Sequence, residues 1–184
     1  IDKAHLTVTA DNQSRLYGQA NPSLTQTISG FVNNENLASS GVSGTALGST
    51  SATATTNVGS AAIVASTSGL SAGNYDFTAS STDGTLTIDK AHLTVTADNK
   101  TRLYGQANPT LTTTVSGFVN GESASTAAGF AGAGTASTTA VAATNVGTAT
   151  ITAGAGTLAA TNYDFANLTD GTLTIDKAHL TVTA

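Results

Sequence analysis

A ten-residue sequence, Ile-Asp-Lys-Ala-His-Leu-Thr-Val-Thr-Ala, occurs three times in this chain, at residues 1–10, 88–97 and 175–184. The copies are separated by 87 residues, and self-similarity at a fixed period is the signature of a repeat architecture. We therefore predict two complete repeats, at residues 1–88 and 89–175. The remaining residues, 176–184, are expected to be the opening strand of a third repeat.

Apolar and polar residues alternate in each repeat, which is the pattern of half-buried β-strands. In the opening segment, Ala91, Leu93 and Val95 alternate with polar neighbours. Similar short segments follow, at residues 111–115, 149–153, 162–165 and 171–175. Roughly seven short strands per repeat, with turn signals between them and no helical pattern, favour an all-β fold of tandem small immunoglobulin-like β-sandwich repeats. A β-grasp-like, mostly-β repeat is the alternative.

The turns and the middle of each repeat are also indicated by the sequence. Asn120-Gly121 is a strong signal for a hairpin turn, and the first repeat has Asn33-Asn34 at the same place, which adopts the left-handed conformation less easily. Residues 123–143 are rich in Ala, Ser, Thr and Gly, and here the two repeats differ most. We expect this variable part to form loops and edge strands.

The junction between the repeats predicts how the array is arranged. Leu86 and Ile88 are apolar at even positions, whereas Ala91 and Leu93 are apolar at odd positions, so the buried side changes across Asp89-Lys90. No Gly-rich or Ser-rich linker lies between them, and a junction this short restricts hinge motion. We therefore predict an elongated rod.

The charge balance excludes several classes of partner. Only 9% of the residues are charged, and 11 acidic residues against 6 basic ones give a net charge of −5. Nucleic-acid binding needs clustered Lys and Arg, and docking on anionic lipid needs the same. No apolar run approaches the about 20 residues of a membrane span. We expect no nucleic-acid partner and no membrane insertion.

No enzymatic chemistry is indicated. The chain has no cysteine, which excludes disulfides and thiolate catalysis. No nucleophile–base pair or carboxylate pair stands at a workable spacing. We predict that the protein is not an enzyme.

Four tyrosines are the candidate contact residues. Tyr17 and Tyr104 precede glycines, and Tyr75 and Tyr163 stand in Asn-Tyr-Asp-Phe sequences. Each ring is interpreted either as a platform that stacks on a sugar or as a core tyrosine whose hydroxyl finds a hydrogen-bond partner. The core role is the prediction, and a glycan contact is the alternative.

Metal binding is not predicted. His5, His92 and His179 occupy one position of the opening strand, on its polar face beside Lys, so we expect solvated side chains. Calcium needs six to eight oxygen ligands, and the acidic and amide side chains near the junction are spread out: Asp83, Asp89, Asp98 and Asn99. We predict no cofactor and no calcium.

Residues 1–33 and 88–120 are identical at 28 of 33 positions, including Arg-Leu-Tyr-Gly-Gln-Ala-Asn-Pro and Ser-Gly-Phe-Val-Asn. Together with Asn-Val-Gly, Asn-Tyr-Asp-Phe and Asp-Gly-Thr-Leu-Thr-Ile downstream, this order of motifs resembles the MBG domain of the Tyr-Gly type. Such domains form tandem arrays in large bacterial adhesins. The regular Asp-Lys-Ala-His spacer is also similar to the repeats of cyclic-di-GMP-regulated biofilm-matrix adhesins of pseudomonads.

The resemblance implies a function and a location. It implies structural stalk repeats of a secreted surface adhesin that support cell aggregation and biofilm formation. The location implied is extracellular, at the bacterial surface or in the biofilm matrix, after two-partner secretion. The partners implied are neighbouring repeats, biofilm exopolysaccharide and other adhesin rods. As an alternative, the repeats themselves bind exopolysaccharide weakly and gain strength by multivalency.

Overall fold

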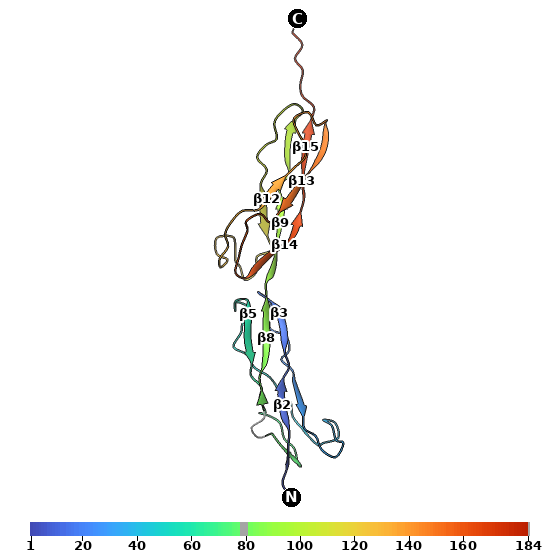
Figure 1. Cartoon of the computed structure of the whole chain (residues 1–184), viewed down its shortest axis with the longest axis vertical. Helices are drawn as coiled ribbons and strands as arrows, with labels where there is room; N and C mark the ends of the chain where they lie inside the picture. The colour runs from blue at the N-terminus through green and yellow to red at the C-terminus, as the bar shows by residue number, and fades with distance from the viewer. Residues whose placement is uncertain (78–80, 184) are drawn as a thin grey trace. The chain divides into compact units, whose positions relative to one another are not determined.

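The computed structural model describes residues 1–77 and 81–183. The chain divides into two units, Ile1–Asp89 and Lys90–Ala184, whose strands are drawn in Figure 1. Both units consist of β-strands, and the described residues contain no helix. The predicted all-β class is therefore confirmed. The division between the units falls between Asp89 and Lys90, one residue beyond the predicted end of the first repeat.

The first unit contains two three-stranded sheets and one two-stranded sheet. Their orders are β4-β2-β7, β3-β8-β5 and β1-β6. The strands are β1 (Ala4–His5), β2 (Thr7–Ala10), β3 (Gln13–Leu16), β4 (Gln26–Ser29), β5 (Gly59–Ile63), β6 (Tyr75–Asp76), β7 (Ser81–Thr82) and β8 (Gly84–Asp89).

The second unit repeats this plan, and its strands β9, β13 and β14 are longer than their equivalents in the first unit. Its sheets have the orders β11-β9-β14 and β10-β15-β13-β12. The strands are β9 (Ala91–Ala97), β10 (Lys100–Leu103), β11 (Thr113–Ser116), β12 (Thr135–Ser137), β13 (Gly147–Gly154), β14 (Tyr163–Thr169) and β15 (Gly171–Asp176).

The strand pairing is mixed in both units. In the second unit, β9 pairs antiparallel with β11 and parallel with β14, while β15 pairs parallel with β10 and antiparallel with β13. The first unit has the same arrangement around β2 and β8. Each unit is thus a β-sandwich-type domain in which the opening and closing strands are central. The first sheet is built on the opening strand and the second on the closing strand.

The core lies between the two sheets and follows the predicted alternation. In the second unit, Ala97 of the opening strand packs with residues of the other sheet, and these core residues are Ala140, Ile151, Ala153, Leu173 and Ile175. In β8 the even positions are buried, whereas in β9 the odd positions are buried. The predicted change of the buried side across Asp89-Lys90 is therefore confirmed, and it occurs within a single residue between two strands.

The turn after β4 or β11 is left-handed in both units, as expected. Asn120 and Gly121 have φ angles of 54° and 72°, and Asn33 and Asn34 have φ angles of 56° and 60°. Asparagine adopts positive φ more readily than most residues because its short side chain forms local hydrogen bonds. The Asn-Asn pair of the first unit therefore takes the same backbone as Asn-Gly.

The last residues differ from the expectation of an opening strand. Residues 177–183 are exposed and form no strand. In the complete units the same sequence is a strand because it pairs with two strands that come later in its own repeat. Residues 177–183 make no such pairing.

Candidate functional site

The four tyrosines occupy two different environments. Tyr75 and Tyr163 are 1% and 0% exposed, and Tyr17 is 3% exposed. Tyr104, which stands at the position of Tyr17 in the other repeat, is 43% exposed. A sugar can stack only on an accessible ring face, so Tyr104 alone among the four presents a surface for such a contact.

The buried tyrosines anchor the turn that follows the second long strand. The hydroxyl of Tyr163 donates to Glu122 Oε2 at 2.5 Å and accepts a hydrogen bond from the backbone nitrogen of Val119 at 3.1 Å. In the first unit, Tyr75 contacts Glu35 and Val32 in the same way. A buried hydroxyl needs such partners. The structure therefore places Tyr75 and Tyr163 in the core role that the sequence favoured.

Aromatic rings surround these tyrosines. The ring of Phe118 lies edge-on to Tyr163, with centroids 5.5 Å apart, and Phe31 lies edge-on to Tyr75 at 5.8 Å. The second unit extends the cluster with Phe130. Edge-to-face pairs of this kind stabilise a core beyond the area that they bury.

The pKa of the Tyr75 phenol is raised above its usual value. The hydrogen bond to Glu35 is the largest cause, and burial and the negative charge of Glu35 act in the same direction. The backbone hydrogen bond with Val32 opposes the shift. The phenol is therefore held in its neutral, hydrogen-donating form and is not a general base near neutral pH.

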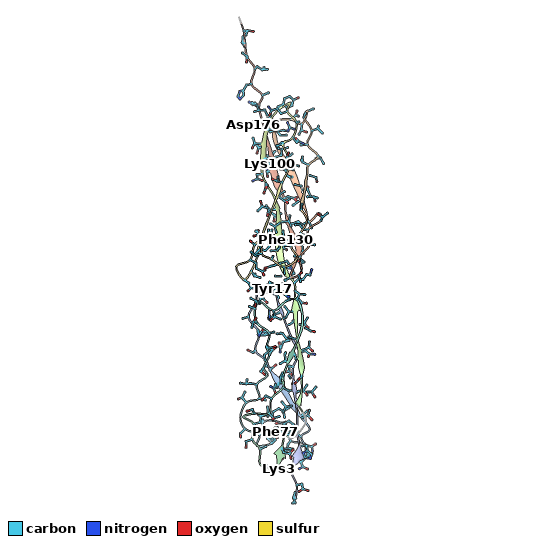
Figure 2. The ribbon with its side chains drawn as sticks, turned by 90° about the vertical axis from the view of Figure 1, so that its left-hand side faces the viewer. Lys3, Tyr17, Phe77, Lys100, Phe130 and Asp176 are labelled. Carbon is cyan, nitrogen blue, oxygen red and sulfur yellow. The ribbon has the colours of Figure 1, made fainter. Side chains whose placement is uncertain are left out.

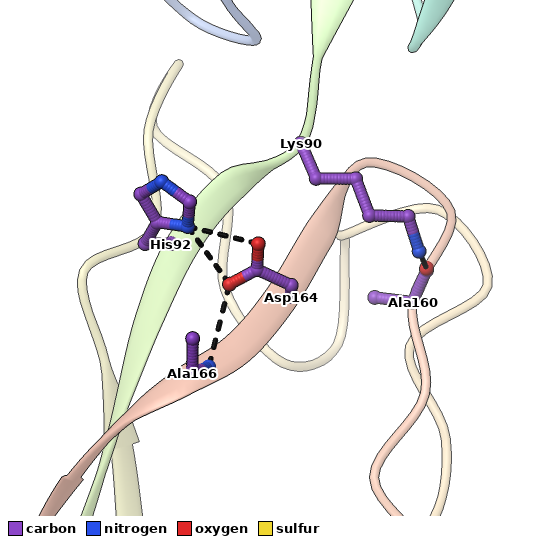
Figure 3. Close-up of polar contacts among 5 residues, drawn as sticks. All are labelled: Lys90, His92, Ala160, Asp164 and Ala166. Atoms are coloured by element: carbon purple, nitrogen blue, oxygen red, sulfur yellow. Dashed lines mark hydrogen bonds and ion pairs between the residues drawn. The ribbon is translucent and has the colours of Figure 1, made fainter.

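Each opening strand carries a His–Asp contact that the sequence did not predict. His92 Nδ1 donates to both carboxylate oxygens of Asp164, at 2.8 and 2.9 Å (Figure 3). His5 and Asp76 form the same contact in the first unit at 2.5 Å. The parallel pairing brings these residues together, because His92 and Asp164 are register partners in β9 and β14. His5 and His92 are exposed as expected, but each has a specific partner.

A lysine contact lies beside each His–Asp contact. Lys90 Nζ donates to the backbone oxygen of Ala160 at 2.9 Å (Figure 3), and Lys3 Nζ donates to Ala72 at 3.0 Å. In Figure 2, Lys3 and Phe77 lie near one end of the first unit and Tyr17 lies near the other. The lysine and histidine contacts therefore hold the start of the opening strand to the segment that leads into its parallel partner.

A buried arginine in each unit is the feature that sequence reasoning missed most clearly. Arg102 is 5% exposed. Its guanidinium donates to Asn108 Oδ1 at 2.8 Å, to the backbone oxygen of Leu103 at 3.1 Å and to that of Val141 at 2.6 Å. Asn108 in turn donates to Ala140 at 2.6 Å. The Arg-Leu-Tyr-Gly-Gln-Ala-Asn-Pro motif is thus a clamp on the variable middle of the repeat.

The first unit repeats the clamp with the equivalent residues. Arg15 is 6% exposed and donates to Asn21 and to the backbone oxygens of Leu16 and Thr53. The middle segments differ in sequence, yet the contacts reach backbone oxygens, which every residue supplies. This explains how the motif stays the same while the middle varies.

Three of the four acidic and amide side chains considered for calcium, those of Asp83, Asp98 and Asn99, form hydrogen bonds within their own units. Asp98 accepts hydrogen bonds from Thr112 at 2.5 Å and Thr114 at 2.7 Å, and Asn99 Oδ1 accepts one from the backbone nitrogen of Thr172 at 2.7 Å. Asp83 accepts one from the backbone nitrogen of Ala65 at 2.9 Å. In residues 1–77 and 81–183, no three His, Asp or Glu side chains form a group that could hold a metal ion.

The hydrogen bonds to Asp98 have an electrostatic consequence. They favour the ionised carboxylate and lower its pKa, with the Thr112 bond contributing most and the Thr114 bond next. Asp11 has a lowered pKa for the same reason, through Thr25 and Thr27. These carboxylates join the residue after the opening strand to the start of its antiparallel partner, β4 in the first unit and β11 in the second.

Among the described residues, no helix is long and apolar enough to cross a membrane. The polar contacts found in the two units link one segment of a unit to another segment of the same unit. They brace the fold of each unit.

The family comparison agrees with this description. The model of the MBG domain (YGX type) matches residues 6–87 and 93–174. The chain therefore belongs to the MBG domain family and contains two such domains in tandem. MBG domains occur in bacterial adhesin-like proteins and are not a known enzyme family. Comparisons with the curated proteins and with the solved structures gave no match.

Proposed function

We propose that these repeats are structural stalk segments of a secreted bacterial surface adhesin, without catalytic activity. In this proposal they form an extended rod that supports cell aggregation and biofilm formation at the cell surface or in the matrix. Two-partner secretion and a relation to the pseudomonad biofilm adhesins are part of the same proposal. No cofactor and no calcium take part.

The observation that supports the proposal most directly is the repetition of a complete internal bracing scheme. The Arg clamp, the Tyr–Glu contact and the His–Asp contact are present in both units, with partners at equivalent positions. Near-identical units of this kind add length without adding a new site. A single residue, Lys90, lies between the last strand of one unit and the first strand of the next.

A direct test alters the number of repeats in the full-length protein displayed on cells. Removing pairs of repeats in frame is expected to reduce cell aggregation and biofilm mass, because the distal part of the adhesin then reaches less far. Replacing the removed repeats with the same number of unrelated rigid β-domains is expected to restore aggregation. If only the native repeats restore it, the stalk function is wrong.

The second candidate function is weak binding of exopolysaccharide by the repeats, and Tyr104 is the observation that favours it. Its ring is 43% exposed, whereas the rings of Tyr75 and Tyr163 are closed to a sugar. Binding of purified exopolysaccharide to the 184-residue chain separates the two functions. The stalk function predicts no binding by the chain or by Tyr104→Ala. The binding function predicts measurable affinity that falls in Tyr104→Ala.

Small-angle X-ray scattering provides an independent measurement on the same chain. The stalk function predicts a long maximum dimension that is unchanged by calcium and by exopolysaccharide. A compact chain, or one that extends only with calcium, contradicts the proposal of a stiff, metal-free rod.

A further inference from the structure

The first and last parts of each unit form one long parallel ladder. In the second unit, β9 runs beside β14 from Ala91↔Tyr163 to Thr96↔Thr169, with an irregularity between Asp164 and Asn167. After two residues in one segment and one residue in the other, the same two chain segments continue as β10 and β15, from Lys100↔Leu173 to Leu103↔Asp176. The ladder therefore passes from one sheet to the other without changing its two segments.

A hydrogen bond also joins the two segments at the point where the ladder changes sheets. Asn99 Oδ1 accepts a hydrogen bond from the backbone nitrogen of Thr172 at 2.7 Å, and Asn12 does the same with Thr85 at 2.8 Å. Residues 98 and 99 lie between β9 and β10. A side-chain oxygen thus takes the place of a backbone acceptor where the strand pairing is interrupted.

The chain enters and leaves this ladder at opposite ends. It enters the second unit at Lys90, next to the pair Ala91↔Tyr163, which is the first pair of the ladder. It leaves at Asp176, which belongs to the last pair and accepts a backbone hydrogen bond from Tyr104 at 2.8 Å. Lys100 and Asp176 are labelled in Figure 2 at the leaving end of this unit.

The first unit has the same geometry. Its ladder begins at Ala4↔Tyr75 and ends at Leu16↔Asp89, and Asp89 accepts a backbone hydrogen bond from Tyr17 at 2.8 Å. The feature therefore does not depend on the sequence differences between the repeats.

This geometry decides how a unit responds when its two ends are pulled. One segment of the ladder is pulled at its beginning and the other at its end, so the two parallel segments are forced to slide past each other. Hydrogen bonds between parallel strands are evenly spaced along the pair. In sliding, all of them resist together, whereas in peeling each bond breaks in turn.

The contacts at the beginning of the ladder reinforce this arrangement. The His92–Asp164 contact and the Lys90–Ala160 contact hold the first residues of the opening strand to the segment beside it. These contacts oppose fraying of the opening strand at the end where the load enters.

We propose that each unit is a tension-bearing clamp, in which the parallel ladder between the first and last segments carries the load applied through the chain ends. The clamp rests on the proposed stalk function for its biological use. Beyond the stalk function, this proposal specifies which hydrogen bonds carry the load and in which pulling direction the unit resists unfolding most strongly.

Single-molecule stretching of the 184-residue chain tests whether the unfolding force depends on the pulling direction. One molecule is held through residues added at its two ends. A second is held through cysteines introduced at Thr101 and Thr172, which are exposed residues on the two sides of the ladder; the chain has no other cysteine. The clamp predicts that the second unit opens at a several-fold higher force in the end-to-end direction than across the ladder. Equal forces in the two directions overturn it.

A second experiment tests the asparagine hydrogen bond at the point where the ladder changes sheets. Replacing both Asn12 and Asn99 by alanine is expected to lower the end-to-end unfolding force of both units, because each unit loses a hydrogen bond between the two segments of its ladder. Lys100→Ala is the matched control, because Lys100 lies in the ladder but its side chain forms no hydrogen bond across it within residues 1–77 and 81–183; it is expected to leave both forces unchanged. Unchanged forces in the double variant contradict the role of the asparagines.

The two proposals fail in distinguishable ways. Equal forces together with restoration of aggregation by unrelated rigid domains leave the stalk function standing and remove the clamp. A directional force together with aggregation that needs the native repeats leaves the clamp standing and removes the purely structural stalk.

Discussion

The hydroxyl oxygen of Tyr163 lies 2.5 Å from a carboxylate oxygen of Glu122, and the ring of Tyr163 is fully buried. The same hydroxyl bonds the backbone of Val119. A single side chain in β14 thus fixes the turn that follows β11. This contact ties the two outer strands of one sheet together, because β11 and β14 flank β9 on opposite sides.

Replacing Tyr163 by phenylalanine is expected to destabilise the second unit by about 1–3 kcal/mol, because the half-buried Glu122 carboxylate and the backbone nitrogen of Val119 lose their hydrogen bonds to the buried hydroxyl. Hydrogen exchange measured segment by segment on the whole chain reports this loss in β11 and β14. The control is Tyr104→Phe, which alters an exposed ring and is expected to change stability by less than about 0.5 kcal/mol. Equal effects of the two substitutions contradict the role of the Tyr163 hydroxyl.

Arg102→Lys is expected to destabilise the second unit by about 2 kcal/mol or more, because an ammonium group cannot reproduce the planar fork that reaches three acceptors. The exchange of amide hydrogens in residues 138–142 is expected to accelerate most, since the guanidinium holds Val141 and, through Asn108, Ala140. Lys100→Gln, in the same strand, serves as the control. If Arg102→Lys leaves the middle segment as protected as before, the clamp on that segment is wrong.

The lowered pKa of Asp98 predicts an acid dependence of stability. In the folded chain the pKa of the Asp98 carboxyl group lies below its ordinary value of 3.8, so the group binds a proton less readily than in the unfolded chain. The contribution of Asp98 to the free energy of unfolding is therefore fully present above the ordinary pKa. It is lost as the pH falls through the lowered pKa of the folded chain. Thermal unfolding followed between about pH 2 and pH 6 measures the loss.

The matched variant for this pH dependence is Thr112→Val with Thr114→Val, which removes both hydroxyl donors to Asp98. It is expected to be less stable than the native chain above pH 4 and to show a weaker acid dependence, since its Asp98 pKa returns toward 3.8. A steeper acid dependence in the variant contradicts the assigned cause.

The contact between His92 and Asp164 is expected to contribute modestly. The two side chains are 48% and 36% exposed, and exposed pairs contribute about 0.2–1 kcal/mol. A double-mutant cycle with His92→Ala and Asp164→Ala measures the interaction energy. His179, whose segment forms no strand, provides the control position, where alanine is expected to change nothing. An interaction energy of zero removes the contact from the bracing scheme.

Gly84 stands where the ladder of the first unit changes sheets, and its replacement by alanine is expected to cost about 1–3 kcal/mol through overpacking. A Cβ at this position lies 2.5 Å from the backbone oxygen of Ala10, and backbone cannot move aside easily. Gly73→Ala is the control, because a Cβ there meets nothing within 4 Å. Denaturant unfolding of the two variants compares them directly.

The all-β class, most of the strands and the change of the buried side could be predicted because each is written locally in the sequence. The alternation in 91–97 defines which residues are buried, and Asn120-Gly121 defines a turn. Alternation does not say which strand lies alongside, so the parallel pairing of β9 with β14 could not be derived from it. His92–Asp164 and Tyr163–Glu122 follow from that pairing and were hidden for the same reason.

The buried arginine was hidden by a different cause. A lone Arg in a polar segment is most often a solvated residue, since arginine is rarely buried without a partner. Here the partners are two backbone oxygens and one amide oxygen, and backbone oxygens leave no trace in a sequence. The only local signal was the six-residue spacing of Arg and Asn, which both repeats share.

The parallel ladder has a consequence for the order in which a newly made chain acquires structure. Its two segments stand at opposite ends of each repeat, so the opening segment has no ladder partner until the closing segment is present. A chain that emerges N-terminus first from a narrow passage therefore completes its domains one at a time, each in a single late step. Each such step shortens the unfolded segment outside the passage, so folding there hinders the chain from slipping back.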